Sequence, residues 1–336
     1  MMESQSSLPA SEVIAPASEP ERSPGNAQAR RNAPDRAWTI LLTVLALGVL
    51  VAAAVIVAEL SRIGAPAIGH AGVKSFVTKS TWDPTRDLFG AAPYIYGTLV
   101  TSAVALVLAL PISIGLALFL TEMTPSALRS IVSFPIALLA GIPSVVYGLW
   151  GLFVLVPLLR KPVEPFLTNT LGFIPLFRGA PIGLGYLAAG VILAIMILPT
   201  ITSISIEVLR TVPGQLREAA LALGATRWEA IRTAVLPYAR AGIVGATMLG
   251  LGRALGETMA VTMVIGNSPT IRASLFAPGY SLPAVIANEF AEASGEMHTG
   301  ALAALGLLLF AVTVLLNIAA RVLVRMSRRG PVRVAA

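Results

Sequence analysis

Two opposite charges interrupt an otherwise apolar stretch in the last third of the chain. Arg253 and Glu257 lie four residues apart within the apolar run of about 241–265. In a continuous helix this spacing places both side chains on one face, where they can form an ion pair. Arg253 is about twelve residues into the run, and hence about 18 Å along a helix that rises roughly 1.5 Å per residue. A charge at that depth in a membrane is costly and should face a cavity or a partner.

Two compatible interpretations remain open for this pair. A guanidinium matches the geometry of a phosphate-like oxyanion, and Glu257 could hold Arg253 when no anion is present. Glu257 could also repel the anion or accept a proton from it. Alternatively, the pair could only fix helix packing, with Gly252 and Gly256 allowing close approach of a neighbouring helix. The residue types alone do not choose between transport and packing.

The elements that must position these charges are predicted to be transmembrane helices. Hydrophobic residues make up 56% of the chain and charged residues 12%, which is far from the balance of a soluble domain. A bilayer core about 30 Å thick is crossed by roughly 20 apolar residues in a helix. We therefore predict an all-α, polytopic membrane protein with about six spans, at residues 37–58, 95–120, 131–159, 182–204, 241–265 and 299–322.

The third run is long for one straight helix and short for two complete spans. It contains Pro135, Pro143 and Pro157, and proline is tolerated in membrane helices where neighbours satisfy the freed carbonyl. We predict a single kinked span over 131–159. A helix followed by a re-entrant turn is the alternative.

The segments outside the spans follow from composition and charge. Residues 1–36 are polar and are predicted to be a disordered tail. The run 37–58 is longer than the roughly 7–15 apolar residues of a cleavable signal peptide, so it is predicted to be a retained first span. Residues 59–94 are predicted to form an outer loop, 95–325 the permease transmembrane domain, and 326–336 a basic cytoplasmic tail.

Basic residues set the expected orientation. Arginine and lysine are about twice as frequent on the side that would receive both termini as on the other side, and an excess of basic residues marks the cytoplasmic side. This distribution favours cytoplasmic termini and a cytoplasmic loop over 205–240. It also explains the net positive charge without nucleic-acid binding.

The loop over 205–240 is predicted to contain two short amphipathic helices. Pro213-Gly214 should start the first and Gly224 should end it, and a second could run from about 227 to 236 before Pro237. Such helices could dock another protein or lie on the lipid surface.

Several kinds of active site are excluded or disfavoured. The sequence has no cysteine, which excludes a disulfide and a thiolate metal site. His70 and His298 lie far apart in predicted loops and are interpreted as surface histidines, so no metal site is expected. The nearest approach to a P-loop, at 72–75, lacks the required glycine. We therefore expect a transport subunit that is not an enzyme.

The loop carries the pattern of a known family. Glu218-Ala219-Ala220, then Gly224, then Leu236-Pro237 resemble the cytoplasmic loop of permease subunits of bacterial ABC importers, although Ala234 stands where isoleucine is usual. The resemblance implies the type I ABC importer permease fold. It also implies that a coupling helix containing Glu218, Ala219, Ala220 and Gly224 docks on a separate ATPase subunit.

A narrower resemblance follows downstream. Residues 252–261, with the sequence Gly-Arg-Ala-Leu-Gly-Glu-Thr-Met-Ala-Val, are similar to a signature of phosphate-uptake permeases of the PstC type, and 274–290 resembles the outer loop that follows it. Sulfate and molybdate permeases share the Arg-Ala-Leu-Gly-Glu core but usually differ after the glutamate. The resemblance spans about 90–325. It implies a substrate pathway that includes Arg253, Glu257 and Thr258.

The resemblance also implies a set of partners. A phosphate importer of this kind would contain a second permease subunit of the PstA type, two ATPase subunits of the PstB type and an extracytoplasmic phosphate-binding protein of the PstS type. This chain would hold no cofactor, and ATP and Mg would bind the ATPase. Residues 59–93 and 266–298 would receive the binding protein, with short helices near 283–293. A sulfate or molybdate permease, or an ion-coupled secondary transporter or channel, remains the alternative.

Overall fold

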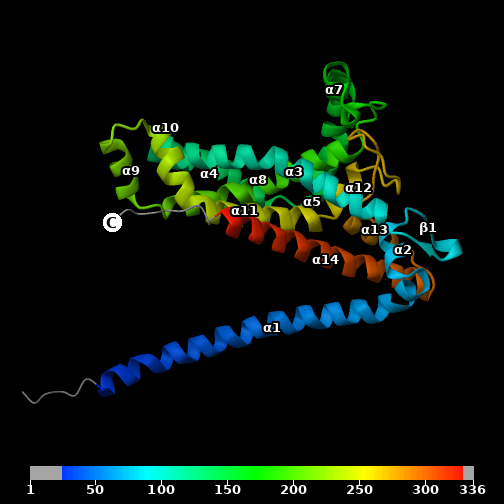
Figure 1. Ribbon diagram of the computed structural model, residues 1–336, viewed down its shortest axis with the longest axis horizontal. Coiled ribbons are helices and arrows are strands. Elements are labelled where there is room, and N and C mark those ends of the chain that lie inside the picture. The colour runs from blue at the N-terminus through cyan, green and yellow to red at the C-terminus, as the bar shows by residue number, and fades with distance from the viewer. Residues whose placement is uncertain (1–24, 328–336) are drawn as a thin grey trace, which may run out of the picture. The chain divides into compact units, whose positions relative to one another are not determined.

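The apolar runs fold as helices in the computed structural model, which describes residues 25–327 (Figure 1). The chain divides into two units, one up to Ile56 and one from Val57 onward. Six helices in the described residues are long and apolar enough to cross a membrane, which agrees with the predicted number. They are Trp38–Ala71, Ala92–Met123, Ser144–Leu171, Tyr186–Arg210, Arg227–Gly256 and Glu296–Val322.

The first helix is longer than predicted at both ends. Helix α1 runs from Gly25 to Ala71, so the expected disorder is wrong for residues 25–36, and residues 1–24 lie outside the described part. The flanking segment 25–36 contains three alanines and three arginines, which are strong helix formers. Extending an existing helix costs far less than nucleating a new one, so the apolar span propagates into its flanks.

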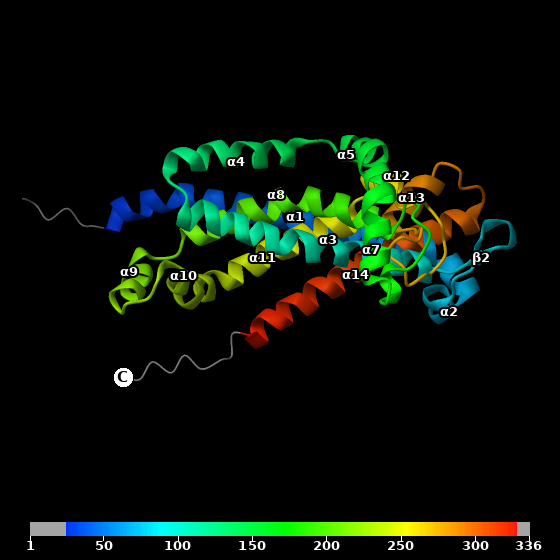
Figure 2. The same ribbon diagram turned by 90° about the horizontal axis from the view of Figure 1, so that it is seen from above.

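A layer of packed helices forms the core of the second unit. Helix α3 (Ala92–Leu118) packs along α8 (Tyr186–Arg210), and α11 (Leu236–Gly256) packs against both. Figure 2 shows these three helices lying along one axis, with α11 running opposite to α3 and α8. Gly190 permits the close approach of α8 to α3, because a Cβ there would lie 2.4 Å from Val104. Helix α14 (Glu296–Ser327) packs against α11 and extends past residue 325, where the basic tail was predicted to begin.

The predicted kinked span at 131–159 is wrong, because the chain breaks into separate helices. Helix α4 (Ser126–Gly141) ends before Pro143, and Ile142 is extended with φ −70° and ψ 129°. A proline disfavours the helical conformation of the residue before it, which explains the break. Beyond it follow α5 (Ser144–Trp150), the π-helical turns Gly151–Leu155 and Leu159–Val163, α6 (Val156–Leu158) and α7 (Glu164–Leu171). Figure 2 shows α4 lying along the same axis as α8, whereas α7 lies across that axis.

The fifth predicted span also has different boundaries. Helix α10 (Arg227–Ala230) continues through a π-helical turn, Ile231–Val235, directly into α11. Pro237 therefore does not end a helix as predicted. It lies in the first turn of α11, where a missing N–H is tolerated. At the other end α11 stops at Gly256, and a separate helix α12 (Met259–Val264) follows.

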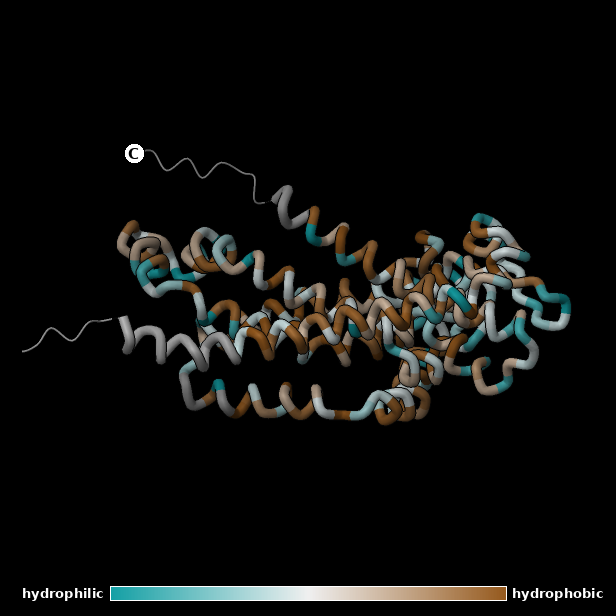
Figure 3. Tube along the Cα trace, turned by 90° about the horizontal axis from the view of Figure 1, so that it is seen from below, coloured by the Kyte–Doolittle hydropathy of each residue, from teal (hydrophilic) through white to brown (hydrophobic). Residues whose placement is uncertain are grey.

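The connections between the spans hold short elements. They comprise α2 (Val73–Thr78), strands β1 (Trp82–Asp83) and β2 (Leu88–Phe89) paired antiparallel around the 3-10 turn Pro84–Arg86, the π-helical turn Phe119–Met123, the 3-10 turn Pro175–Phe177, α9 (Gly214–Ala222) and α13 (Leu282–Glu289). Helix α13 confirms the helix expected near 283–293. Figure 3 shows hydrophilic residues concentrated at the ends of the second unit and hydrophobic ones along its middle.

One predicted surface residue is buried instead. His298 is 8% exposed, and its Nε2 lies 3.1 Å from Glu289 Oε2. The same oxygen accepts a hydrogen bond of 2.8 Å from the Trp82 indole nitrogen, and Phe89 stacks on the imidazole. The aromatic side chains of the β1–β2 hairpin cover His298, so the surface interpretation is wrong for it, whereas His70 is exposed.

Candidate transport site and coupling loop

Arg253 lies in the last turn of α11 with its side chain exposed. Its Nη1 is 3.4 Å from the hydroxyl oxygen of Thr200, which follows Pro199 in the middle of α8. The contact places Arg253 beside the centre of a membrane-crossing helix, the depth expected from the sequence. A cation there needs a water-filled cavity or a partner, because the bilayer core does not solvate it.

The predicted ion pair between Arg253 and Glu257 is not formed. The helix ends between them, and Glu257 is extended with φ −70° and ψ 126°. Its Oε1 accepts a hydrogen bond of 3.2 Å from the backbone N–H of Ala260 in the first turn of α12. The i, i+4 argument fails because it requires an unbroken helix. Thr258 lies in the break, and its hydroxyl donates to the carbonyl of Gly256 at 3.3 Å.

The glycines beside the arginine leave open space. A Cβ added at Gly252 or Gly256 would meet nothing within 4 Å. The close approach predicted for these glycines therefore does not occur within this chain. The face of α11 that carries Arg253 is instead available to a solute or to another subunit.

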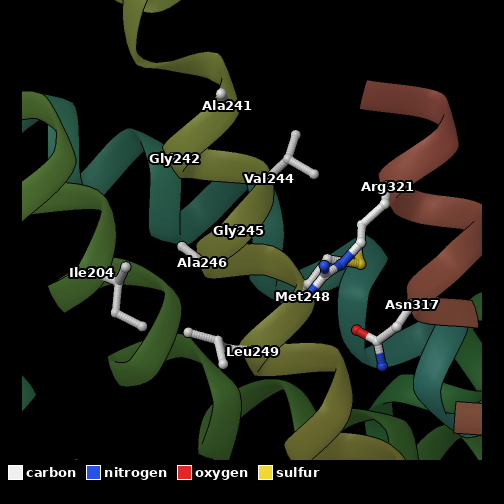
Figure 4. Close-up of a pocket in the computed structure, with 10 residues that line it drawn as sticks. All are labelled: Ile204, Ala241, Gly242, Val244, Gly245, Ala246, Met248, Leu249, Asn317 and Arg321. Carbon is white, nitrogen blue, oxygen red and sulfur yellow. The ribbon is translucent and has the colours of Figure 1, made fainter. Parts of the chain in front are cut away.

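A groove lies beside the part of α11 that precedes Arg253, over residues 241–249. It has a volume of about 600 Å³, and Figure 4 shows small α11 residues between α8 on one side and α14 on the other. Leu249, one turn before Arg253, and Ile204, one turn after Thr200, both line it. Arg321 extends from α14 toward Met248 (Figure 4). The sequence analysis missed this groove, although Asn317 and Arg321 in the last apolar run are polar residues that could have indicated it.

The first helix in the loop over 205–240, α9, begins and ends where the sequence predicts. Pro213 is the N-cap of α9, and Gly224, with φ +86°, follows the helix. A left-handed conformation of this kind is readily adopted by glycine. Thr226 then starts α10 through a capping box with Glu229.

The residues predicted to dock on another subunit lie at the surface. Glu218, Ala219 and Gly224 are exposed and Ala220 is partly buried. Helix α9 buries none of its residues. Leu223 is 89% exposed and Trp228 62% exposed, so the tip of the loop presents apolar side chains beyond the bundle.

Arg217 attaches α9 to the rest of the bundle. Its guanidinium donates to both carboxylate oxygens of Glu122, with Nη2–Oε1 at 2.7 Å and Nε–Oε2 at 3.0 Å. The same group donates to the carbonyls of Val212 at 2.7 Å and Leu209 at 3.1 Å. The sequence analysis placed Arg217 in the loop but did not find Glu122, which lies 95 residues earlier.

Six apolar helices in the described part of the chain, an exposed arginine beside the centre of one of them and a projecting loop are the features of a multi-pass membrane protein. Residues 109–329 match the family described as binding-protein-dependent transport system inner membrane component. The chain belongs to this family, and it is therefore an inner-membrane transport component.

Two relatives share about half of their aligned residues with this chain. The phosphate transport system permease protein PstC of Mesorhizobium japonicum is 52% identical over 260 residues, which cover 76% of this chain and 80% of the relative. The protein of the same name from Xylella fastidiosa is 47% identical over 313 residues, or 91% of this chain and 95% of the relative. The PstC-type resemblance of the sequence is thereby confirmed.

A solved structure supports the fold. A chain of a bacterial alginate ABC transporter superposes with a TM-score of 0.57 at 17% identity, covering 91% of this chain and 99% of that chain. The predicted type I ABC importer permease fold is confirmed.

Proposed function

We propose that this chain is the permease subunit of an ATP-driven importer that moves inorganic phosphate across the cytoplasmic membrane. The observation that carries the proposal is the 52% identity, over most of both chains, to a relative named as a phosphate transport permease. The sequence Gly-Arg-Ala-Leu-Gly-Glu-Thr-Met at 252–259 lies where the structure exposes a cation at mid-span.

Arg253 is the proposed contact for the phosphate. Its guanidinium has no carboxylate partner among residues 25–327, because Glu257 is turned toward the start of α12. A planar guanidinium can donate two parallel hydrogen bonds to an oxyanion. Glu257 and Thr258 hold the break between α11 and α12, so they shape the pathway beside the arginine.

Two partners follow from the geometry and the family. A second, PstA-type permease subunit would cover the open face of α11 and close the groove into a pathway. Two PstB-type ATPase subunits would bind ATP and Mg, and one would dock on Glu218, Ala219, Ala220 and Gly224. ATP-driven closure would displace α9 and shift the permease between its two access states. Both termini would then be cytoplasmic.

The opposite end of the second unit would receive a PstS-type phosphate-binding protein. Helix α13 and the β1–β2 hairpin lie there, away from α9 (Figures 1 and 2). The contact between His298 and Glu289, together with Trp82, fastens these two connections to each other. They therefore offer one joined surface to a loaded binding protein.

Phosphate uptake in a strain that lacks its own permease subunit tests the proposal. Expression of this chain with its ATPase, second permease and binding protein should restore uptake of labelled phosphate, and excess sulfate or molybdate should not compete. Competition by sulfate or molybdate without phosphate uptake would identify the other oxyanion permease. Uptake that persists with an ATPase unable to hydrolyse ATP would instead support an ion-coupled transporter.

A further inference from the structure

Helix α9 has an unusual attachment to the bundle. It buries no residue, so packing of its own side chains holds it weakly. Within the described chain, the side-chain hydrogen bonds made by α9 all come from Arg217. Helix α9 also packs against the π-helical turn Ile231–Val235 and α10, and Arg217 adds the polar contact that joins it to the other helices.

The ion pair of Arg217 is more enclosed than a typical surface pair. The side chains of Arg217 and Glu122 are 27% and 11% exposed. By contrast, the nearby pair of Arg210 and Glu207 is 48% and 70% exposed and lies within a single helix. The Arg217–Glu122 pair is bidentate, so it fixes the relative orientation of the two side chains. It is also largely shielded from solvent, so dissolved salt screens it little. It therefore constrains both the distance and the orientation of α9.

Two of the groups that accept hydrogen bonds from Arg217 belong to the helices of the core. Glu122 lies on the π-helical turn Phe119–Met123 that continues α3. The carbonyl of Leu209, which Arg217 also binds, belongs to the last turn of α8. Since α3 packs along α8 and Thr200 of α8 contacts Arg253, one guanidinium connects α9 to both helices that lead toward the transport site.

The apolar residues around this contact pack together in a separate cluster. A second apolar cluster, separate from the main core, surrounds the ends of these helices; its buried members include Leu118, Leu120, Ile206, Leu209, Ile231 and Val235. Two π-helical turns, Phe119–Met123 and Ile231–Val235, contribute residues to it. Such turns often mark functional adjustments of a helix. Both turns therefore belong to the packing around the Arg217–Glu122 contact.

We propose that the Arg217–Glu122 pair is a positioning contact that transmits displacement of α9 to α3 and α8. The inference rests on the proposed function, in which an ATPase docks on α9. Docking itself uses the outer face of the loop, whereas the pair lies between α9 and the bundle. Breaking the pair should separate two events that are normally linked, ATP hydrolysis on the docked ATPase and movement of the solute.

The test uses the complete importer, reconstituted in proteoliposomes from wild-type or variant permease. Arg217→Met and Glu122→Gln should each co-purify with the ATPase at wild-type levels and keep ATP hydrolysis that responds to the binding protein. Phosphate uptake should fall at least tenfold. The matched control is Arg210→Met, which breaks the exposed pair with Glu207 and should leave all three readouts unchanged.

A crosslink makes the result independent of any general loss of folding. The chain has no cysteine, so Glu122→Cys with Arg217→Cys introduces one defined pair of thiols. A short bifunctional thiol crosslinker should rejoin α9 to α3 and raise uptake toward the wild-type rate, and each single cysteine variant should show no gain.

Two outcomes would overturn the positioning role. Wild-type uptake in Arg217→Met with intact co-purification would show that the pair transmits nothing. Loss of ATPase co-purification in both variants, with no recovery on crosslinking, would make the pair a folding contact of the loop. Failure of the wild-type chain to bind any ATPase would instead refute the proposed function, so the two failures are distinguishable.

Discussion

At the scale of residues, the break after Gly256 decides what Arg253 can do. An intact helix would have placed Glu257 beside the guanidinium, whereas the break directs the carboxylate to the N–H of Ala260. Among the residues that the structure describes, Arg253 makes one polar contact, a long one of 3.4 Å to Thr200. A weakly held cation can exchange that contact for an incoming oxyanion, while a cation in an ion pair must first lose its partner.

The first prediction concerns Arg253 itself. Arg253→Met should reduce phosphate uptake at least tenfold, because the mid-span cation is removed. Arg253→Lys should recover only part of the rate, because an ammonium keeps the charge but lacks the planar fork. Uptake of labelled phosphate at matched membrane levels measures both, and Arg240→Met, an exposed arginine at the start of α11, is the control.

The double variant Arg253→Met with Glu257→Met separates transport from packing. It should assemble but remain inactive, because the two residues do not form a pair whose joint removal could restore function. Full phosphate uptake by this double variant would contradict a role of Arg253 in contacting phosphate.

The second prediction concerns Glu257. Glu257→Gln keeps an oxygen that can accept from Ala260, so it should retain the start of α12. Glu257→Ala removes the acceptor and should destabilise the protein by about 0.5–2 kcal/mol, as for other lost helix caps. Thermal unfolding of the detergent-solubilised protein measures the difference, and equal destabilisation by both substitutions would argue against the capping role.

At the scale of elements, prolines and glycines set where the helices break and where they continue. Pro143 separates α4 from α5, whereas Pro237 is accommodated by the π-helical turn before it. Gly224 lets the chain reverse between α9 and α10 at φ +86°. The docking helix is therefore held by one turn, by packing against the π-helical turn Ile231–Val235 and by the hydrogen bonds of Arg217, and it buries none of its residues.

The third prediction tests the turn. Gly224→Asp should leave membrane insertion intact, because a Cβ at this position meets nothing within 4 Å. It should nevertheless reduce ATPase co-purification and uptake, because the new charge lies on the docking surface and glycine adopts the left-handed conformation at φ +86° more readily than any residue with a side chain. Gly214→Ala is the matched control, because its Cβ also meets open space but its φ is not positive. Normal uptake in Gly224→Asp would remove Gly224 from the docking surface.

At the scale of the whole molecule, the second unit offers different surfaces at its two ends. The α9 tip exposes Leu223 and Trp228, and the opposite end exposes Phe290 just after α13. An importer requires the ATPase and the binding protein to meet opposite sides of the membrane. The two exposed apolar sites therefore report on the orientation of the chain.

The fourth prediction uses single cysteines in this cysteine-free chain. Leu223→Cys should react with a membrane-impermeant thiol reagent only from the cytoplasmic side, and Phe290→Cys only from the outer side. Labelling in intact cells and in inverted membrane vesicles measures the accessibility of each. The reverse pattern would invert the proposed topology, and crosslinks from 276–290 to the ATPase would do the same.

The amino-acid sequence by itself determined the membrane class, the number of spans and the first helix of the coupling loop. Those features depend on local composition and on single residues such as Pro213 and Gly224, whose backbone preferences act without distant partners. The sequence also identified Arg253 and Glu257 as unusual, because charge inside an apolar run is visible without a structure.

Only the tertiary structure decided how those charges are used. Whether α11 continues past Gly256 depends on packing of α12 against α5 and α8, which no local pattern contains. The contacts Arg253–Thr200 and Arg217–Glu122 join residues 53 and 95 positions apart. The burial of His298 depends on the β1–β2 hairpin, more than two hundred residues earlier. Trp82 of that hairpin binds Glu289, 207 positions later, and Glu289 in turn contacts His298. Such partners are fixed by the free energy of packing whole helices together, so they emerge only when the chain is folded.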